Sequence, residues 1–202
     1  MIPSLRYTLA FVINVVMPAA AYRLALPHYG LLGALVASAI PLLAWVCIDL
    51  ICSRHFDALS AMVLAAIAMS LLILVSEPSQ WLRAVREPLV SGIIGAFFLL
   101  SLFARRPLVF YLARSTLARE RTGRALEFDT MWQVRPALVK SIRLMTAVWG
   151  VGLVAENAGR LWVTYSMDAD EAYRLSAFAR YATYAGLMGW SIFYRHRYIK
   201  RQ

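Results

Sequence analysis

Six apolar stretches, each close to the length of a helix that crosses a bilayer, constrain this chain more than any other feature. A helix needs about 20 apolar residues to cross about 30 Å of hydrocarbon, and irregular backbone cannot face lipid because its amides would stay unpaired. The stretches are 7–26, 29–50, 58–75, 89–104, 142–163 and 175–194. They predict an all-α fold: a polytopic bundle of six transmembrane helices, forming one domain over residues 1–202.

The composition agrees with a membrane protein. Hydrophobic residues make up 61% of the chain and charged residues 16%, whereas soluble domains average about 45–50% and about 25%. These values exclude a disordered chain, a secreted disulfide scaffold and a water-soluble enzyme.

The net charge of +10 predicts the orientation of the helices. With six spans, 15 of the 21 basic residues fall on the side that holds both termini and the second and fourth loops. Short basic loops stay in the cytoplasm. Both termini are therefore predicted to be cytoplasmic, as is a basic loop over 105–141.

The first apolar stretch has an alternative interpretation as a cleaved signal peptide. Arg6 precedes an apolar run, and the alanines at 19–21 resemble a cleavage site. The apolar run continues to Leu26, which favours a retained span. A mature chain that begins near Tyr22 would instead indicate cleavage.

Glu87 and Pro88 predict where the fourth helix begins. An acidic N-cap followed by proline in the first turn is a favourable start, since the proline needs no hydrogen bond there. Before this point Trp81, Leu82 and Val85 would share one face of a helix. We therefore expect a separate short helix at the membrane interface here.

After the fourth span, 108–118 mixes aromatic and basic residues and predicts a short interfacial helix. The remainder up to Lys140 is expected to be a loop. Basic residues near a bilayer attract anionic headgroups, each by about 1 kcal/mol. This location favours lipid over nucleic acid, which we do not expect to bind. The candidate headgroup-binding residues are Arg105, Arg106, Arg114 and Arg119.

Ionisable residues inside the predicted spans are the strongest candidates for a site, because buried charge in a membrane usually pairs or serves function. Glu156 and Arg180 lie equally far from Asp168 in the connecting loop. An antiparallel hairpin would bring them to similar depth, which predicts an ion pair between them. Arg160 lies one turn from Glu156 on the same helix face.

Two interpretations of these charges stay open. They could form an outward-facing pocket with net positive charge, suited to a phosphate or carboxylate. Alternatively, Glu156 and Arg180 only join two helices, while the other charges reach towards the headgroups. The candidate ligand-binding residues are Glu156, Asn157, Arg160, Arg180, Arg23, Arg86 and Glu87.

Pairs of small residues four apart indicate how the last three helices meet, since such pairs let helix backbones approach closely in lipid. They predict a compact unit of the fourth, fifth and sixth spans. The pairs are Ser91 with Gly95, Gly92 with Ala96, Ala155 with Gly159, Ala182 with Gly186, and Ala185 with Gly189.

Several short motifs in this sequence are typical of a known family. Their residues include Arg86, Glu87, Gly92, Gly95, Ser101, Arg106, Pro107, Leu108, the run Tyr111–Leu112–Ala113–Arg114, and Arg160. These motifs resemble those of a bacterial family of uncharacterised multi-span inner-membrane proteins, distantly similar to intracellular septation protein A. The resemblance extends over most of the chain and implies an integral inner-membrane protein. It assigns no functional residue, although Glu156 lies in a matching segment.

The leading functional hypothesis is a non-enzymatic helix bundle that supports envelope processes through contacts with membrane lipids, other membrane proteins or further copies of itself. The sequence contains no zincin helix, nucleophile elbow, phosphate loop or dinucleotide fingerprint, so we expect no catalytic residue, metal or cofactor. The alternative is a small transporter or carrier of an anionic substrate or lipid headgroup. Transporters often contain internal repeats, and none is evident in this sequence.

Overall fold

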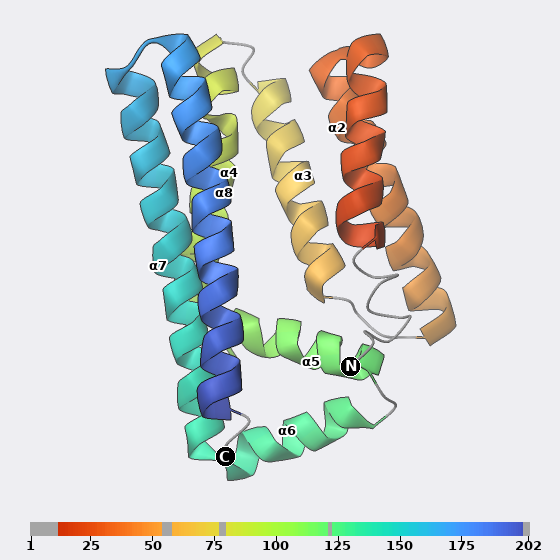
Figure 1. Ribbon diagram of the computed structural model, residues 1–202. Coiled ribbons are helices and arrows are strands. Elements are labelled where there is room, and N and C mark those ends of the chain that lie inside the picture. The colour runs from red at the N-terminus through yellow and green to blue at the C-terminus, as the bar shows by residue number, and fades with distance from the viewer. Residues whose placement is uncertain (1–11, 54–57, 77–79, 121–122, 200–202) are drawn as a thin grey trace. The chain divides into compact units, whose positions relative to one another are not determined.

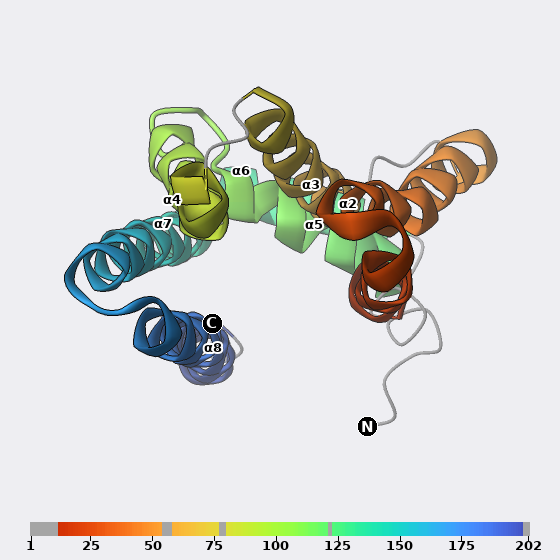
Figure 2. The ribbon, with the colours of Figure 1, turned by 90° about the horizontal axis from the view of Figure 1, so that it is seen from above.

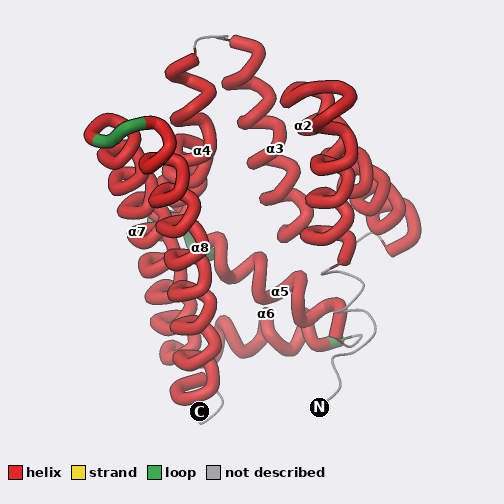
Figure 3. The backbone as a smooth tube through the Cα atoms, turned by 45° about the horizontal axis from the view of Figure 1, so that its top comes forward, coloured by secondary structure: helices red, strands yellow, loops and turns green. Residues whose placement is uncertain are grey.

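The computed structural model describes residues 12–53, 58–76, 80–120 and 123–199 (Figure 1). Every regular element in these ranges is a helix, as Figure 3 shows. The predicted all-α fold is therefore confirmed. The chain divides into two compact units, which we describe separately: Met1–Pro78 with Tyr111–Thr130, and Ser79–Phe110 with Met131–Gln202.

The first unit begins with a π-helical turn, η1 (Val12–Val16), followed by α2 (Met17–Ser53). Gly30 interrupts α2 with φ 63° and ψ −169°, a conformation open essentially to glycine alone. The two parts of α2 that this kink joins run in opposite directions (Figure 1). The predicted spans 7–26 and 29–50 thus correspond to two antiparallel segments of one element, although Arg6 and residues 7–11 lie outside the described part.

Helix α3 (Ala58–Ser76) packs against α2 and matches the predicted span 58–75. Most of α5 (Leu108–Glu120) and of α6 (Arg124–Val134) also belongs to the first unit. The Nε atom of Arg114 on α5 donates a hydrogen bond of 2.9 Å to Asp129 on α6.

Helix α6 lies where a loop was expected, so that expectation was wrong. Gly123 has φ 98° and permits the turn before the helix. Glu127 lies in the first turn, where a carboxylate interacts favourably with the helix dipole. Ala125 and Phe128, three residues apart, are buried. This short apolar face is too sparse to stand out in a sequence dominated by longer apolar runs.

The second unit contains three long helices, α4 (Gln80–Ser101), α7 (Pro136–Ser166) and α8 (Ala169–Tyr194), and ends in the π-helical turn η2 (Arg195–Ile199). Helix α7 packs against both α4 and α8 (Figure 2). Neighbouring helices run antiparallel, and a tight turn joins α7 to α8 (Figure 1). The predicted compact unit of the last three spans corresponds to this arrangement.

Glycines set the close approach of these helices. A Cβ atom on Gly95 of α4 would lie 2.9 Å from the Cβ atom of Leu153 and 3.0 Å from the carbonyl oxygen of Gly150, both on α7. A Cβ atom on Gly152 would lie 2.8 Å from Leu187 on α8. Other predicted small-residue positions face open space within the described chain: Gly159, Gly186 and Gly189.

Helix α4 is longer than predicted and has no start at Glu87. The expected interfacial helix and the fourth span form one continuous helix, with Pro88 in its interior. A proline there removes one backbone hydrogen bond. Val85 and Pro88 are both fully buried, and their packing offsets that loss. The side chains of Trp81 and Leu82, which were expected to share a face with Val85, lie outside the described part of the structure.

The end of α4 is held by side chains from both sides of the turn. The Ser101 hydroxyl donates to the Phe98 carbonyl at 2.6 Å and accepts from the Leu108 backbone amide at 3.0 Å. Arg143 on α7 donates to the Leu102 carbonyl at 2.8 Å. These bonds satisfy backbone groups that a helix end leaves unpaired.

Helices α7 and α8 both begin about six residues before their predicted spans, 142–163 and 175–194. Pro136 occupies the first turn of α7, where proline is favourable. The connecting loop expected around Asp168 is largely the start of α8: Asp170 and Glu171 lie in the first turn of this helix, where carboxylates interact favourably with the helix dipole.

By length and composition, two helices of the described chain are long and apolar enough to cross a membrane: Met17–Ile48, which includes the kink at Gly30 within α2, and α7. Shorter apolar helices cover Ser60–Val75 and Leu108–Ala118. The all-helical architecture is thus established, while the arrangement of six spans stays a prediction.

Candidate functional site

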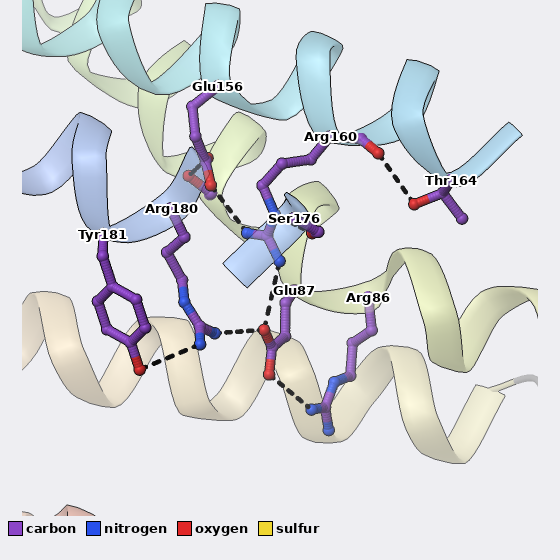
Figure 4. A network of polar contacts seen from close by, with 9 residues as sticks. Arg86, Glu87, Glu156, Arg160, Thr164, Ser176, Arg180 and Tyr181 are labelled. Atoms are coloured by element: carbon purple, nitrogen blue, oxygen red, sulfur yellow. Dashed lines mark hydrogen bonds and ion pairs between the residues drawn. The ribbon is translucent and has the colours of Figure 1, made fainter. Parts of the chain in front are cut away.

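Five ionisable side chains from three helices converge within the second unit (Figure 4). Arg86 and Glu87 come from α4, Glu156 and Arg160 from α7, and Arg180 from α8. We call this set the polar cluster. It has a buried part on α7 and a more exposed part around Glu87.

The buried part is centred on the Glu156 carboxylate, whose side chain is 0% exposed. It accepts a hydrogen bond of 2.8 Å from Nη1 of Arg160, one turn along the same helix, and another from the Ser91 hydroxyl on α4. Nε of Arg160 donates to the Ser176 hydroxyl on α8 at 2.6 Å. This chain of bonds connects all three helices and compensates two buried charges, as such charges require.

The exposed part is centred on the Glu87 carboxylate, whose side chain is 49% exposed. Its Oε2 atom accepts hydrogen bonds from Arg160 at 3.3 Å and from Arg180. Its Oε1 atom lies 3.8 Å from Nη2 of Arg86. One carboxylate is therefore surrounded by three guanidinium groups (Figure 4).

Arg86 is the least satisfied member of the polar cluster. Its side chain is only 7% exposed, and its Nε and Nη1 atoms have no hydrogen-bond partner in the described structure. Within the described chain it forms an ion pair with Glu87, whose 3.8 Å separation exceeds hydrogen-bond length. A buried guanidinium with unpaired N–H groups is costly, which makes Arg86 a candidate for binding an anion.

The predicted ion pair between Glu156 and Arg180 is not formed. Glu156 is paired with Arg160, and Arg180 reaches across to Glu87. The similar depth expected from the hairpin does not determine which way a side chain faces. Arg160 already shares the face of Glu156, so it takes that carboxylate, while Arg180 finds its partner on α4.

The remaining predicted site residues lie apart from these ion pairs. Asn157 is beside the polar cluster on α7, where a Cβ atom on Gly92 would overlap its amide. Its Oδ1 atom has no hydrogen-bond partner in the described chain. Arg23 belongs to the first unit, where it is exposed, and is not among the residues gathered at the polar cluster.

Sequence reasoning missed the hydroxyl groups of Ser91 and Ser176. Both obey a four-residue spacing that could have identified them: Ser91 follows Glu87 by one helical turn, and Ser176 precedes Arg180 by one turn. Glu156 and Arg160 have the same four-residue spacing on α7. Each of the three helices therefore contributes two polar residues that are one turn apart. Such residues share one helix face.

The candidate headgroup residues are divided between the two units. Arg105 is exposed, and the Arg106 guanidinium lies 4.8 Å from the centre of the Phe110 ring. Arg114 belongs to the other unit and pairs with Asp129, which offsets its charge. The Arg119 side chain lies outside the described part.

The chemistry of the polar cluster is that of anion recognition. Guanidinium groups bind carboxylates and phosphates through charge-assisted hydrogen bonds in a fixed planar geometry, and Glu87 is held in this way. Three guanidinium and two carboxylate groups leave one net positive charge.

The sequence matches no protein-family model, and it is significantly similar to no curated protein and to no solved structure.

Proposed function

We propose that this chain is a non-enzymatic helix bundle of the bacterial inner membrane that supports envelope processes through contacts with lipids and other membrane proteins. The observation that carries the proposal is the exposure of its long apolar helices. Only 22% of the apolar window in α2 and 28% of that in α7 are buried within the chain. A long apolar helix must be covered by protein or lipid, and so little cover from the chain favours lipid.

The polar cluster supports a fixed bundle over a moving carrier. Glu156 and Arg160 are almost fully buried and bonded to α4 and α8. A carrier must open and close around its site, and moving α7 away from α4 and α8 would break the buried hydrogen bonds that Glu156 and Arg160 form with Ser91 and Ser176. The Glu156 and Arg160 pair is therefore assigned a structural role in this proposal.

Six spans with both termini in the cytoplasm belong to the same proposal. Within each unit, three helical passes alternate in direction: two segments of α2 followed by α3, and then α4, α7 and α8 (Figure 1). Each unit contributes three passes, so the two units together contribute six. An even number of crossings supports placing both termini on the same side of the membrane. Membership of the inner-membrane family similar to intracellular septation protein A is likewise proposed, on the short motifs quoted above.

Reporter fusions test this topology. Alkaline phosphatase fused after Gln202 should be inactive, and green fluorescent protein at the same point should fluoresce, because the C-terminus is expected in the cytoplasm. Phosphatase inserted in the turn between α7 and α8, after Met167, should be active. Active phosphatase at the C-terminus would contradict the proposed orientation.

Photocrosslinking in intact membranes tests the proposed contacts. A photoreactive residue at Phe178, 69% exposed on α8, should give reproducible crosslinks to lipid or to specific membrane proteins. The same photoreactive residue at Leu153, 2% exposed, is the matched control and should crosslink only within the chain.

A transport assay tests the alternative function. Uptake of labelled phosphate by proteoliposomes above that of empty liposomes would favour a carrier over a fixed bundle.

A further inference from the structure

We propose that Arg86, Arg160 and Arg180 form a binding site for a phosphate group, in which the Glu87 carboxylate is a resident anion that the phosphate displaces. The inference deepens the proposed function, on which it rests, by naming the headgroup chemistry that the bundle would contact. The same phosphate chemistry could be presented by a lipid headgroup or by a free phosphate.

The positions of the three guanidinium groups carry the first step. They contact the two oxygens of Glu87 from three directions, with Arg160 at 3.3 Å and Arg86 at 3.8 Å. A single carboxylate has two oxygens and one charge, so it saturates neither the charge nor the N–H donors around it. The unpaired Nε and Nη1 atoms of Arg86 are the direct sign of this mismatch.

Charge identifies the better ligand. Without the carboxylate of Glu87, the three guanidinium groups of the polar cluster are balanced only by the single charge of Glu156, which leaves two positive charges. A phosphate monoester carries about −1.5 to −2 charges at pH 7 and three acceptor oxygens. It would therefore match both the charge and the number of guanidinium groups, whereas a second carboxylate would only replace Glu87.

Burial explains how the exchange could occur. Arg86 and Arg160 are 7% and 5% exposed and form a fixed base, whereas Glu87 is 49% exposed and Arg180 31%. Glu87 can thus rotate towards solvent or headgroups without unpacking a helix. The buried pair of Glu156 and Arg160 need not break, so this binding requires no opening of the bundle.

The test measures equilibrium binding of radiolabelled inorganic phosphate to the purified full chain in detergent. Glu87→Gln removes the competing charge but keeps the side-chain size, so affinity should rise about tenfold, as expected for one charge-assisted hydrogen bond. Arg86→Gln should lower phosphate affinity about tenfold, because it removes one charge-assisted hydrogen bond to the phosphate. Arg174→Gln, an exposed arginine on α8 outside the polar cluster, is the matched control and should have no effect.

Unchanged phosphate affinity in both Glu87→Gln and Arg86→Gln would overturn the proposal. If Glu87→Gln does not fold, as judged by helical circular dichroism, Glu87→Asp keeps the charge on a shorter side chain and should give a smaller rise. The comparison of wild type with Arg86→Gln decides the question independently. Because binding is measured in detergent, it can fail while the reporter fusions confirm the topology, or succeed while they do not.

A lipid arm distinguishes the two sources of phosphate. In nanodiscs, native mass spectrometry should show that the wild type retains phosphatidic acid over phosphatidylcholine, and that Arg86→Gln loses this preference. Binding of inorganic phosphate without the lipid preference would support the site and assign a free phosphate as its ligand. If the wild type binds neither inorganic phosphate nor phosphatidic acid in preference to phosphatidylcholine, the proposal is refuted.

Discussion

Glu156→Leu should lower the free energy of unfolding in detergent by about 3 kcal/mol, because removing one partner of a buried ion pair strands the other charge. The Glu156 side chain is 0% exposed, and the substitution also leaves the Ser91 hydroxyl without its acceptor. Arg160 would keep Glu87 and Ser176 as partners, so the expected loss lies at the lower end of the range for broken buried pairs. Denaturant titration followed by tryptophan fluorescence measures it.

Two further variants separate this effect from a general response to mutation. Glu171→Leu removes an exposed carboxylate in the first turn of α8 and should cost less than about 1 kcal/mol. Glu156→Leu combined with Arg160→Leu should recover most of the stability, because apolar side chains can replace a buried ion pair at little cost. Equal losses for Glu156→Leu and Glu171→Leu would show that Glu156 is not a buried tie between helices.

The helices could be predicted largely from the length of the apolar stretches, because lipid and protein cores both demand apolar surface along a helix. The α3 helix follows its predicted span closely. Helix ends were less predictable where polar residues continue a helix, as at Asp170 and Glu171 of α8. The continuity of α4 through Pro88 depends on tertiary packing that local preferences do not contain.

The members of the polar cluster could be predicted, but their pairing could not. The cost of charge in an apolar span singles out Glu156, Arg160 and Arg180 wherever they point. Counting residues along a hairpin estimates depth alone. Partner choice depends on the rotation of each helix about its axis, whereas glycines such as Gly95 allow the close approach of α4 to Leu153 on α7.

These glycine contacts lead to the second large effect: Gly95→Leu should destabilise the second unit by about 3 kcal/mol, at the upper end for overpacked cores. The first atom of the new side chain would meet the Cβ of Leu153 at 2.9 Å and the Gly150 carbonyl at 3.0 Å. Neither can move without shifting α7. The same denaturant titration measures the loss.

Gly159→Leu is the matched control, because nothing lies within 4 Å of a Cβ atom at this position on α7. Leucine favours a helix over glycine by nearly 1 kcal/mol, so Gly159→Leu should be neutral or stabilising within the isolated chain. Similar losses for both variants would contradict the close approach of α4 to α7.

Since α4 carries Ser91 and Glu87 while α7 carries Glu156 and Arg160, forcing these helices apart should also weaken phosphate binding. Gly159→Leu should leave that binding intact, which would tie the proposed site to the spacing set by Gly95.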